Sequence, residues 1–200
     1  MQSQEQILIF HQHNNLALAI NLRWKQKKHQ TAFKRLLAAI IDGVIFLPLL
    51  YIERFLNQVY SSTLTHFAWE AIHAFLPIVY SIILHYKSGQ TIGKWVTGIR
   101  VLDLSETRKL TFLQSVLRDS FYLLMAIVAI CYFAFKLSNT ENTDMALSDY
   151  SNFSSNALII WTVLELLTMF TNLKKRTIHD YIAGSVVIRT SENKANRSLF

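Results

Sequence analysis

"RLLAAIIDGVIFLPLLYI", residues 35–52, is an apolar run that contains a single carboxylate, and it decides the class of this fold. A predominantly apolar stretch of about 20 residues is long enough to cross the hydrocarbon core of a bilayer as a helix. Three further apolar runs follow, at residues 68–86, 123–135 and 157–170. We therefore expect an all-α integral membrane protein, a four-helix transmembrane bundle with spans at about 34–55, 67–87, 112–137 and 156–173.

A soluble helical protein with a large core is the alternative to a membrane protein. Hydrophobic residues make up 52% of the 200 residues, charged residues make up only 16%, and the mean hydropathy is +0.24. A soluble protein of this size needs helices with a polar face, whereas several of these runs are apolar on all sides. The membrane interpretation is therefore preferred.

The net charge of +7 is distributed unevenly along the chain. Basic residues gather before the first run, between the second and third, and after the fourth, whereas residues 56–66 and 138–155 contain no Lys or Arg. This alternation follows the positive-inside rule. It predicts a multi-pass protein of the bacterial cytoplasmic (inner) membrane with both termini in the cytoplasm. Residues 1–32 are then a cytoplasmic extension and residues 191–200 a cytoplasmic tail. The same placement argues against nucleic acid as a partner and favours anionic lipids at the cytoplasmic face.

Two short segments, 99–103 and 184–190, are rich in β-branched residues and have the length of strands. Both fall on the predicted cytoplasmic side. We expect these short cytoplasmic β-like segments to pair, with Val101 close to Val187, which would tie the middle loop to the end of the chain. Residues 111–114, "TFLQ", have the form of a capping box and predict the start of a helix.

The glycine-rich segment "GQTIGKWVTGIRVLD", residues 89–103, resembles a phosphate-binding loop at first sight. Such a loop has four residues between its first glycine and its Gly-Lys pair, followed by Ser or Thr. Here three residues separate Gly89 from Gly93 and Lys94, and a tryptophan follows. We interpret Gly89, Gly93 and Gly98 as turn residues of an interfacial loop, in which Lys94 points toward lipid phosphates.

Three motifs together resemble the RDD family of bacterial membrane proteins: "KRLLAAIIDG" at 34–43, the glycine-rich segment, and "KKRTIHDYIAGSVVI" at 174–188. The resemblance covers residues 33–190 as an RDD-like transmembrane domain. It implies that Arg35, Asp42 and Asp180 are the residues for which the family is named. Many members have three spans, so the fourth span here looks like an addition. Most members have no assigned activity, and some have been proposed to act as sodium–proton antiporters.

Charged residues inside apolar runs are the candidate functional residues. Arg35 and Asp42 lie two helical turns apart on one face of the first span. A charged aspartate inside a span costs on the order of 3 kcal/mol, so Asp42 needs a partner. Arg35 and Arg118 are the candidate partners, and we expect a network that also includes Asp119 and Asp180. Such a network either fixes helix packing or forms an ion and proton site, and the sequence leaves both open.

Glu165 and His73 are predicted to lie at similar depth near the middle of the bilayer. A Glu–His pair there is a possible proton relay, although a carboxyl group satisfied by a nearby hydroxyl fits equally well. The adjacent pair His179-Asp180 is too few ligands for a catalytic metal, so we expect no metal site, no cofactor and no enzymatic activity.

Two functional classes follow from these residues. The first is a small transporter of monovalent cations and protons that works through intramembrane acidic residues. It would be a homo-oligomer, because four short helices rarely enclose a pathway alone. The second is a non-catalytic membrane scaffold or assembly partner with a basic cytoplasmic face.

Overall fold

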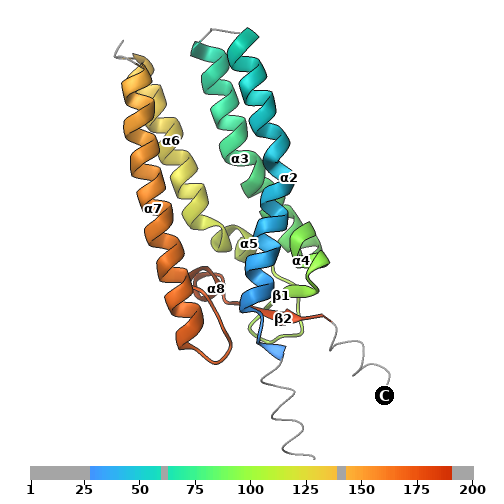
Figure 1. The fold of residues 1–200 in the computed structure, drawn as a ribbon. Helices are drawn as coiled ribbons and strands as arrows, with labels where there is room; N and C mark the ends of the chain where they lie inside the picture. The colour runs from blue at the N-terminus through green and yellow to red at the C-terminus, as the bar shows by residue number, and fades with distance from the viewer. Residues whose placement is uncertain (1–27, 60–62, 139–142, 191–200) are drawn as a thin grey trace, which may run out of the picture.

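The computed structural model describes residues 28–59, 63–138 and 143–190. Four long helices dominate it: α2 (Ala32–Val59), α3 (Thr63–Ser88), α6 (Ser120–Ser138) and α7 (Thr143–Thr171). They run side by side as two pairs, α2 with α3 and α6 with α7 (Figure 1). The remaining elements gather at one end: α4 (Ile92–Val96), α5 (Phe112–Arg118), α8 (Ile178–Ile182), β1 (Ile99–Asp103) and β2 (Ser185–Arg189).

The long helices differ in how well they suit a bilayer. Residues Ala32–Leu56 and Asn152–Thr171 are each long and apolar enough to cross a membrane, and only 6% of their most apolar windows is buried inside the protein. The bent pair α5 and α6 would supply a third span, whereas α3 does not meet the same criterion over the described residues. Apolar helices with so few protein contacts need an apolar solvent, which a bilayer supplies.

The prediction of one unbroken helix over residues 112–137 is wrong. The chain forms α5 and α6 with an angle of 66° between them, and Asp119 lies at the break. The capping box at Thr111 and Gln114 is confirmed as the start of α5. The side chains of Arg118 and Asp119 bond to different partners, Asp180 of α8 and Ser81 of α3.

The boundaries of the other long helices also differ from the prediction. The helix expected at 156–173 already begins at Thr143, inside the segment 138–155 that contains no Lys or Arg. The other two extend a few residues beyond their apolar runs, because polar residues continue a helix where no glycine or proline stops it. The apolar run therefore indicates only the part of each helix that suits lipid, and the helix itself is longer.

The two predicted β-like segments pair, as expected. β1 and β2 form an antiparallel ribbon in which Val101 lies opposite Val187. The small buried core at this end contains Ala38 of α2, Ile99 and Val101 of β1, Leu110 and Val187. Gly89 and Gly98 both have positive φ, of 71° and 67°, as a turn on either side of α4 requires. The ribbon thereby connects the segment after α3 to the segment after α7.

Candidate functional site

Asp180 is the centre of an ion-pair cluster, and its side chain has no solvent exposure. Its carboxylate receives Nη1 of Arg35 at 2.7 Å and Nη1 of Arg118, which come from α2 and α5. The hydroxyl groups of Thr177 and Ser185 donate to it at 3.1 and 3.0 Å. Burial alone would raise the pKa of Asp180, but the two guanidinium groups hold it well below its ordinary value. The cluster ties α2, α5, α8 and β2 together.

The cluster continues into α7 through His179. Nη2 of Arg118 lies 2.9 Å from Nε2 of His179, and Nδ1 of the same ring contacts Oε1 of Glu165. An arginine can only donate, so Nε2 accepts and Nδ1 carries the proton that it donates to Glu165. Burial, followed by the nearby Arg118, lowers the pKa of His179. Glu165 is therefore joined to Asp180 by a continuous chain of contacts.

Asp42 does not join this cluster. Its Oδ1 accepts hydrogen bonds from the hydroxyl of Tyr80 and the backbone N–H of Gly93, both at 2.8 Å. Its Oδ2 accepts one from the hydroxyl of Thr91 at 2.6 Å. The expectation that Arg35 or Arg118 is its partner is therefore wrong. Three neutral donors stabilise this charge, and they attach the glycine-rich segment to α2.

Lys94 points into the protein rather than toward lipid phosphates. Its Nζ lies 2.7 Å from Nε2 of His85, whose side chain is almost fully buried. The other nitrogen of that ring, Nδ1, lies 3.1 Å from the hydroxyl of Ser81, which donates to Asp119 at 2.8 Å. Burial, reinforced by Arg118, lowers the pKa of Lys94 to about 7. The neighbouring Trp95 is 70% exposed, in keeping with the interfacial location expected for the loop.

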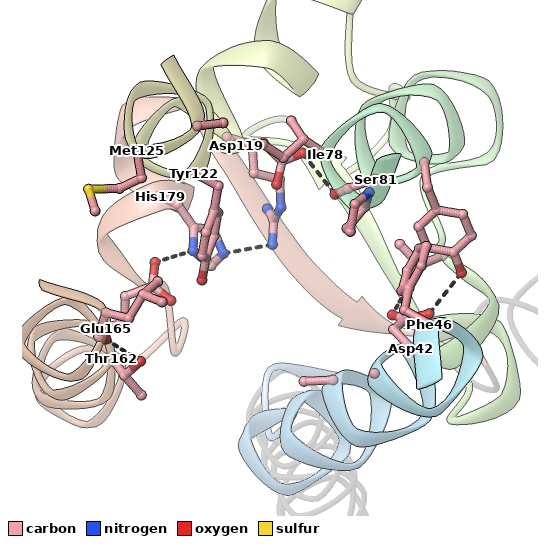
Figure 2. Close-up of a pocket in the computed structure, with 18 of the residues that line it drawn as sticks. Asp42, Phe46, Ile78, Ser81, Asp119, Tyr122, Met125, Thr162, Glu165 and His179 are labelled. Carbon is pink, nitrogen blue, oxygen red and sulfur yellow. Dashed lines mark hydrogen bonds and ion pairs between the residues drawn. The ribbon is translucent and has the colours of Figure 1, made fainter. Parts of the chain in front are cut away.

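A cavity of about 830 Å³ lies between the helix pairs. Most of the polar groups described above line it, whereas Gly93, Trp95, Asp180 and Ser185 do not. Its walls are apolar side chains of the four long helices. Asp42, Asp119 and Glu165 face it from three sides, with Ser81 and His179 beside them (Figure 2). The cavity therefore combines apolar walls with a charged end formed by α4, α5 and α8.

A model of the RDD family matches residues 30–184. The chain belongs to the RDD family. No curated protein and no solved structure matches it. Together with the apolar helices, this membership makes the chain a membrane protein. The arginine and two aspartates that the sequence analysis assigned to the RDD pattern do not form one site. Arg35 binds Asp180, and Asp42 holds the glycine-rich segment about two turns further along α2.

The structure brings together some of the predicted residues of this RDD chain and separates others. Arg35, Arg118 and Asp180 meet, whereas the predicted pair of Glu165 and His73 does not form, because Glu165 contacts His179 instead. His73 lines the same cavity. Among the residues that the structure describes, no three His, Cys, Asp or Glu side chains are grouped as a metal site.

Sequence reasoning missed the polar face of α3. Tyr80, Ser81 and His85 all bind charged groups at the end of the cavity. Ser81 and His85 are four residues apart and therefore lie on one side of the helix, which was a readable signal in an otherwise apolar run. The sequence pattern indicated His179 only as one of two adjacent residues, too few to ligate a catalytic metal.

Proposed function

We propose that this RDD protein is a multi-pass protein of the bacterial cytoplasmic (inner) membrane that exchanges a monovalent cation for a proton. All four long helices cross the bilayer in this proposal, and both termini lie in the cytoplasm. In Figure 1 the basic segments after α3 and after α7 lie at the same end as the start of α2. The positive-inside rule makes that end cytoplasmic and assigns the β1–β2 ribbon to that side.

The observation that carries the proposal is the cavity with carboxylates at its charged end. Asp119 and Glu165 face it with side chains 12% and 15% exposed, so both are reachable yet largely shielded from solvent. Ionisable groups inside a membrane are costly, and they are found mainly where ions or protons pass. A purely structural role would leave the volume beside them filled by side chains.

Exchange requires a carboxylate that holds either a proton or a cation. Asp119 and Glu165 are the candidates, because among the described residues Asp119 accepts one hydrogen bond, from Ser81, and Glu165 accepts one, from His179. Asp42 already accepts three hydrogen bonds, so we assign it the positioning of the glycine-rich segment. Cation binding at Asp119 or Glu165 would displace the proton, and its release to the opposite side would complete the cycle.

The test is cation-dependent proton movement in inverted membrane vesicles from a host without its own antiporters. Sodium, potassium and lithium are added in turn, and wild type is compared with Asp119→Asn, Glu165→Gln and Asp42→Asn at matched protein levels. The proposal expects flux in wild type and a loss of at least about tenfold in the first two variants. Asp103→Asn, the same change in β1 away from the cavity, should keep the flux.

A folded, inserted wild-type protein without flux above empty vesicles would overturn transport. It would favour the second candidate, a scaffold with a basic cytoplasmic face for anionic lipid or a partner protein. Lys28, Lys109 and Lys174 lie at that end, and the single carboxylate of Glu106 pairs with Lys28 and Lys174, so a net positive charge remains there, which suits either partner. Homo-oligomerisation remains part of the transport proposal, and cross-linking in membranes tests it.

A further inference from the structure

Four side chains form a hydrogen-bonded chain across the charged end of the cavity. Nζ of Lys94 lies 2.7 Å from Nε2 of His85. Nδ1 of His85 lies 3.1 Å from Oγ of Ser81, and that hydroxyl lies 2.8 Å from Oδ2 of Asp119. Every link has the length of an ordinary hydrogen bond. This series of hydrogen bonds thus runs from α4 through α3 to the break between α5 and α6.

The hydrogen bonds that link these four side chains are all donated in the same direction, from Lys94 toward Asp119. A protonated lysine has three N–H groups and no lone pair, so Nε2 of His85 accepts and the neutral ring carries its proton on Nδ1. That N–H donates to the oxygen of Ser81, and the hydroxyl of Ser81 donates to Asp119. An ordered series of this kind can pass a proton by short hops from one group to the next.

We propose that Lys94, His85, Ser81 and Asp119 form a proton relay across the charged end of the cavity. The N–H bond of Lys94 breaks as a bond to Nε2 of His85 forms, and the Nδ1 proton passes to Ser81. Ser81 gives its own proton to Asp119. Lys94 ends as a neutral amine, Asp119 ends as a carboxylic acid, and His85 changes tautomer. No other reactant is needed.

Ser81 is required because the ring and the carboxylate are too far apart to bond directly. Nδ1 of His85 lies 4.0 Å from Oδ2 of Asp119, which is beyond hydrogen-bonding distance. The hydroxyl of Ser81 lies within hydrogen-bonding distance of both groups and therefore bridges them. The relay therefore predicts a specific dependence on one serine.

The surroundings allow the proton to sit at either end. Burial lowers the pKa of Lys94 to about 7, so this amine can release a proton near neutral pH. The other charged or titratable groups that act on the relay come from α2, α5 and α8: Arg35, Asp42, Arg118, His179 and Asp180. Two cations oppose two carboxylates in this set, so no fixed net charge holds the proton at one end.

The relay rests on the proposed function for its purpose, since cation binding at Asp119 would drive that group's proton back toward Lys94. Its test does not need transport. The purified full-length chain in lipid nanodiscs is taken from about pH 8 to about pH 5, and infrared spectroscopy follows the C=O band of protonated Asp119. The band is identified by its loss in Asp119→Asn.

The relay expects Ser81→Ala and Lys94→Arg to slow the appearance of this band by about 100-fold, the lower range for a positioned proton donor. Alanine removes the link, and arginine holds its proton too tightly to release it. Ser81→Thr restores a hydroxyl and should restore the rate. The matched controls are Ser88→Ala on the same helix and Lys109→Arg at the surface, which should behave as wild type.

An unchanged rate in Ser81→Ala or Lys94→Arg, or no Asp119 band in wild type, would overturn the relay. The infrared result and the vesicle result are separable. Slowed protonation in the variants without cation-driven flux in wild type would keep the relay and remove transport. Cation-driven flux with unchanged protonation in Ser81→Ala would keep transport and remove the relay.

Discussion

Asp180 forms ion pairs with two guanidinium groups and has no solvent exposure of its own, so each member of the cluster depends on the others. Breaking a buried pair by removing one partner typically costs about 3–5 kcal/mol, because a charge is left uncompensated. We expect Asp180→Asn to lower the free energy of unfolding by about that amount. Denaturant unfolding in detergent micelles measures it. Asp103→Asn in β1 is the control, and an equal effect of the two changes would contradict the cluster.

The buried amine of Lys94 gives a pH dependence of known sign. Burial, with Arg118 second, lowers its pKa from 10.5 to about 7. Between these values the unfolded chain binds a proton that the folded chain lacks, so the free energy of unfolding should rise with pH from about 7 to 10.5. Lys94→Met should flatten this rise. Thermal melts across that range measure it, and identical slopes in both proteins would refute the assignment.

Sequence predicted some residue contacts better than others. Arg35, Arg118 and Asp180 were expected together because all three fall at one end of their helices, and opposite charges in a low dielectric must pair. The partners of Asp42 could not be read in this way. Helical periodicity fixes the face on which Asp42 lies, but it does not reveal which returning loop presents donors such as Gly93 and Thr91 to it.

At the scale of elements, the lengths of the apolar runs predicted where the helices lie. They did not predict where a helix begins, ends or breaks. The break at Asp119 lies inside a segment without proline or glycine, so no local signal marks it. At the break, Arg118 and Asp119 contact groups that are distant in sequence, which a local pattern does not reveal. The β1–β2 ribbon was predictable because β-branched residues cluster at both segments, and both had to lie at the same end of the molecule.

The contact between α2 and α4 depends on the lack of a side chain at Gly93. A Cβ there would lie 2.2 Å from the carbonyl oxygen of Ala38 and 2.9 Å from the carboxylate of Asp42. We expect Gly93→Ala to destabilise the protein by about 1–3 kcal/mol, as overpacking does. Gly43→Ala is the matched control, since nothing lies within 4 Å of its added Cβ. Melting temperatures in detergent compare them, and equal shifts would contradict close packing at Gly93.

At the scale of the whole molecule, the proposed topology predicts which surfaces face each side of the membrane. Single cysteines are placed at Ser105, after β1, and at Asn152, toward the opposite end of α7, with Cys131 replaced by alanine. A membrane-impermeant thiol reagent applied to intact cells should label Asn152→Cys. It should label Ser105→Cys only in inverted vesicles. The reverse pattern would contradict cytoplasmic termini.

The segments that flank the helical bundle before α2 and after α7 are connected through one carboxylate. Glu106 receives Nζ of Lys28 at 2.7 Å and of Lys174 at 2.9 Å, which joins the segment before α2 to the segment after α7. Burial alone would raise the pKa of Glu106, but hydrogen bonds from these lysines lower it to about 2. These ion pairs contribute fully to the free energy of unfolding above about pH 4.5. Their contribution is lost as the pH falls toward 2. These ion pairs could not be predicted from the sequence, because no sequence pattern identifies the partners of a surface ion pair.

The central claim is that the cavity exchanges protons for monovalent cations, and reconstitution tests it most directly. Purified wild-type protein is placed in liposomes that contain a trapped pH indicator, and an inward gradient of sodium, potassium or lithium is applied. The account predicts alkalinisation of the lumen with at least one cation, because protons leave as the cation enters. A lumenal pH that stays equal to that of protein-free liposomes with all three cations, while the protein remains folded and inserted, would contradict it.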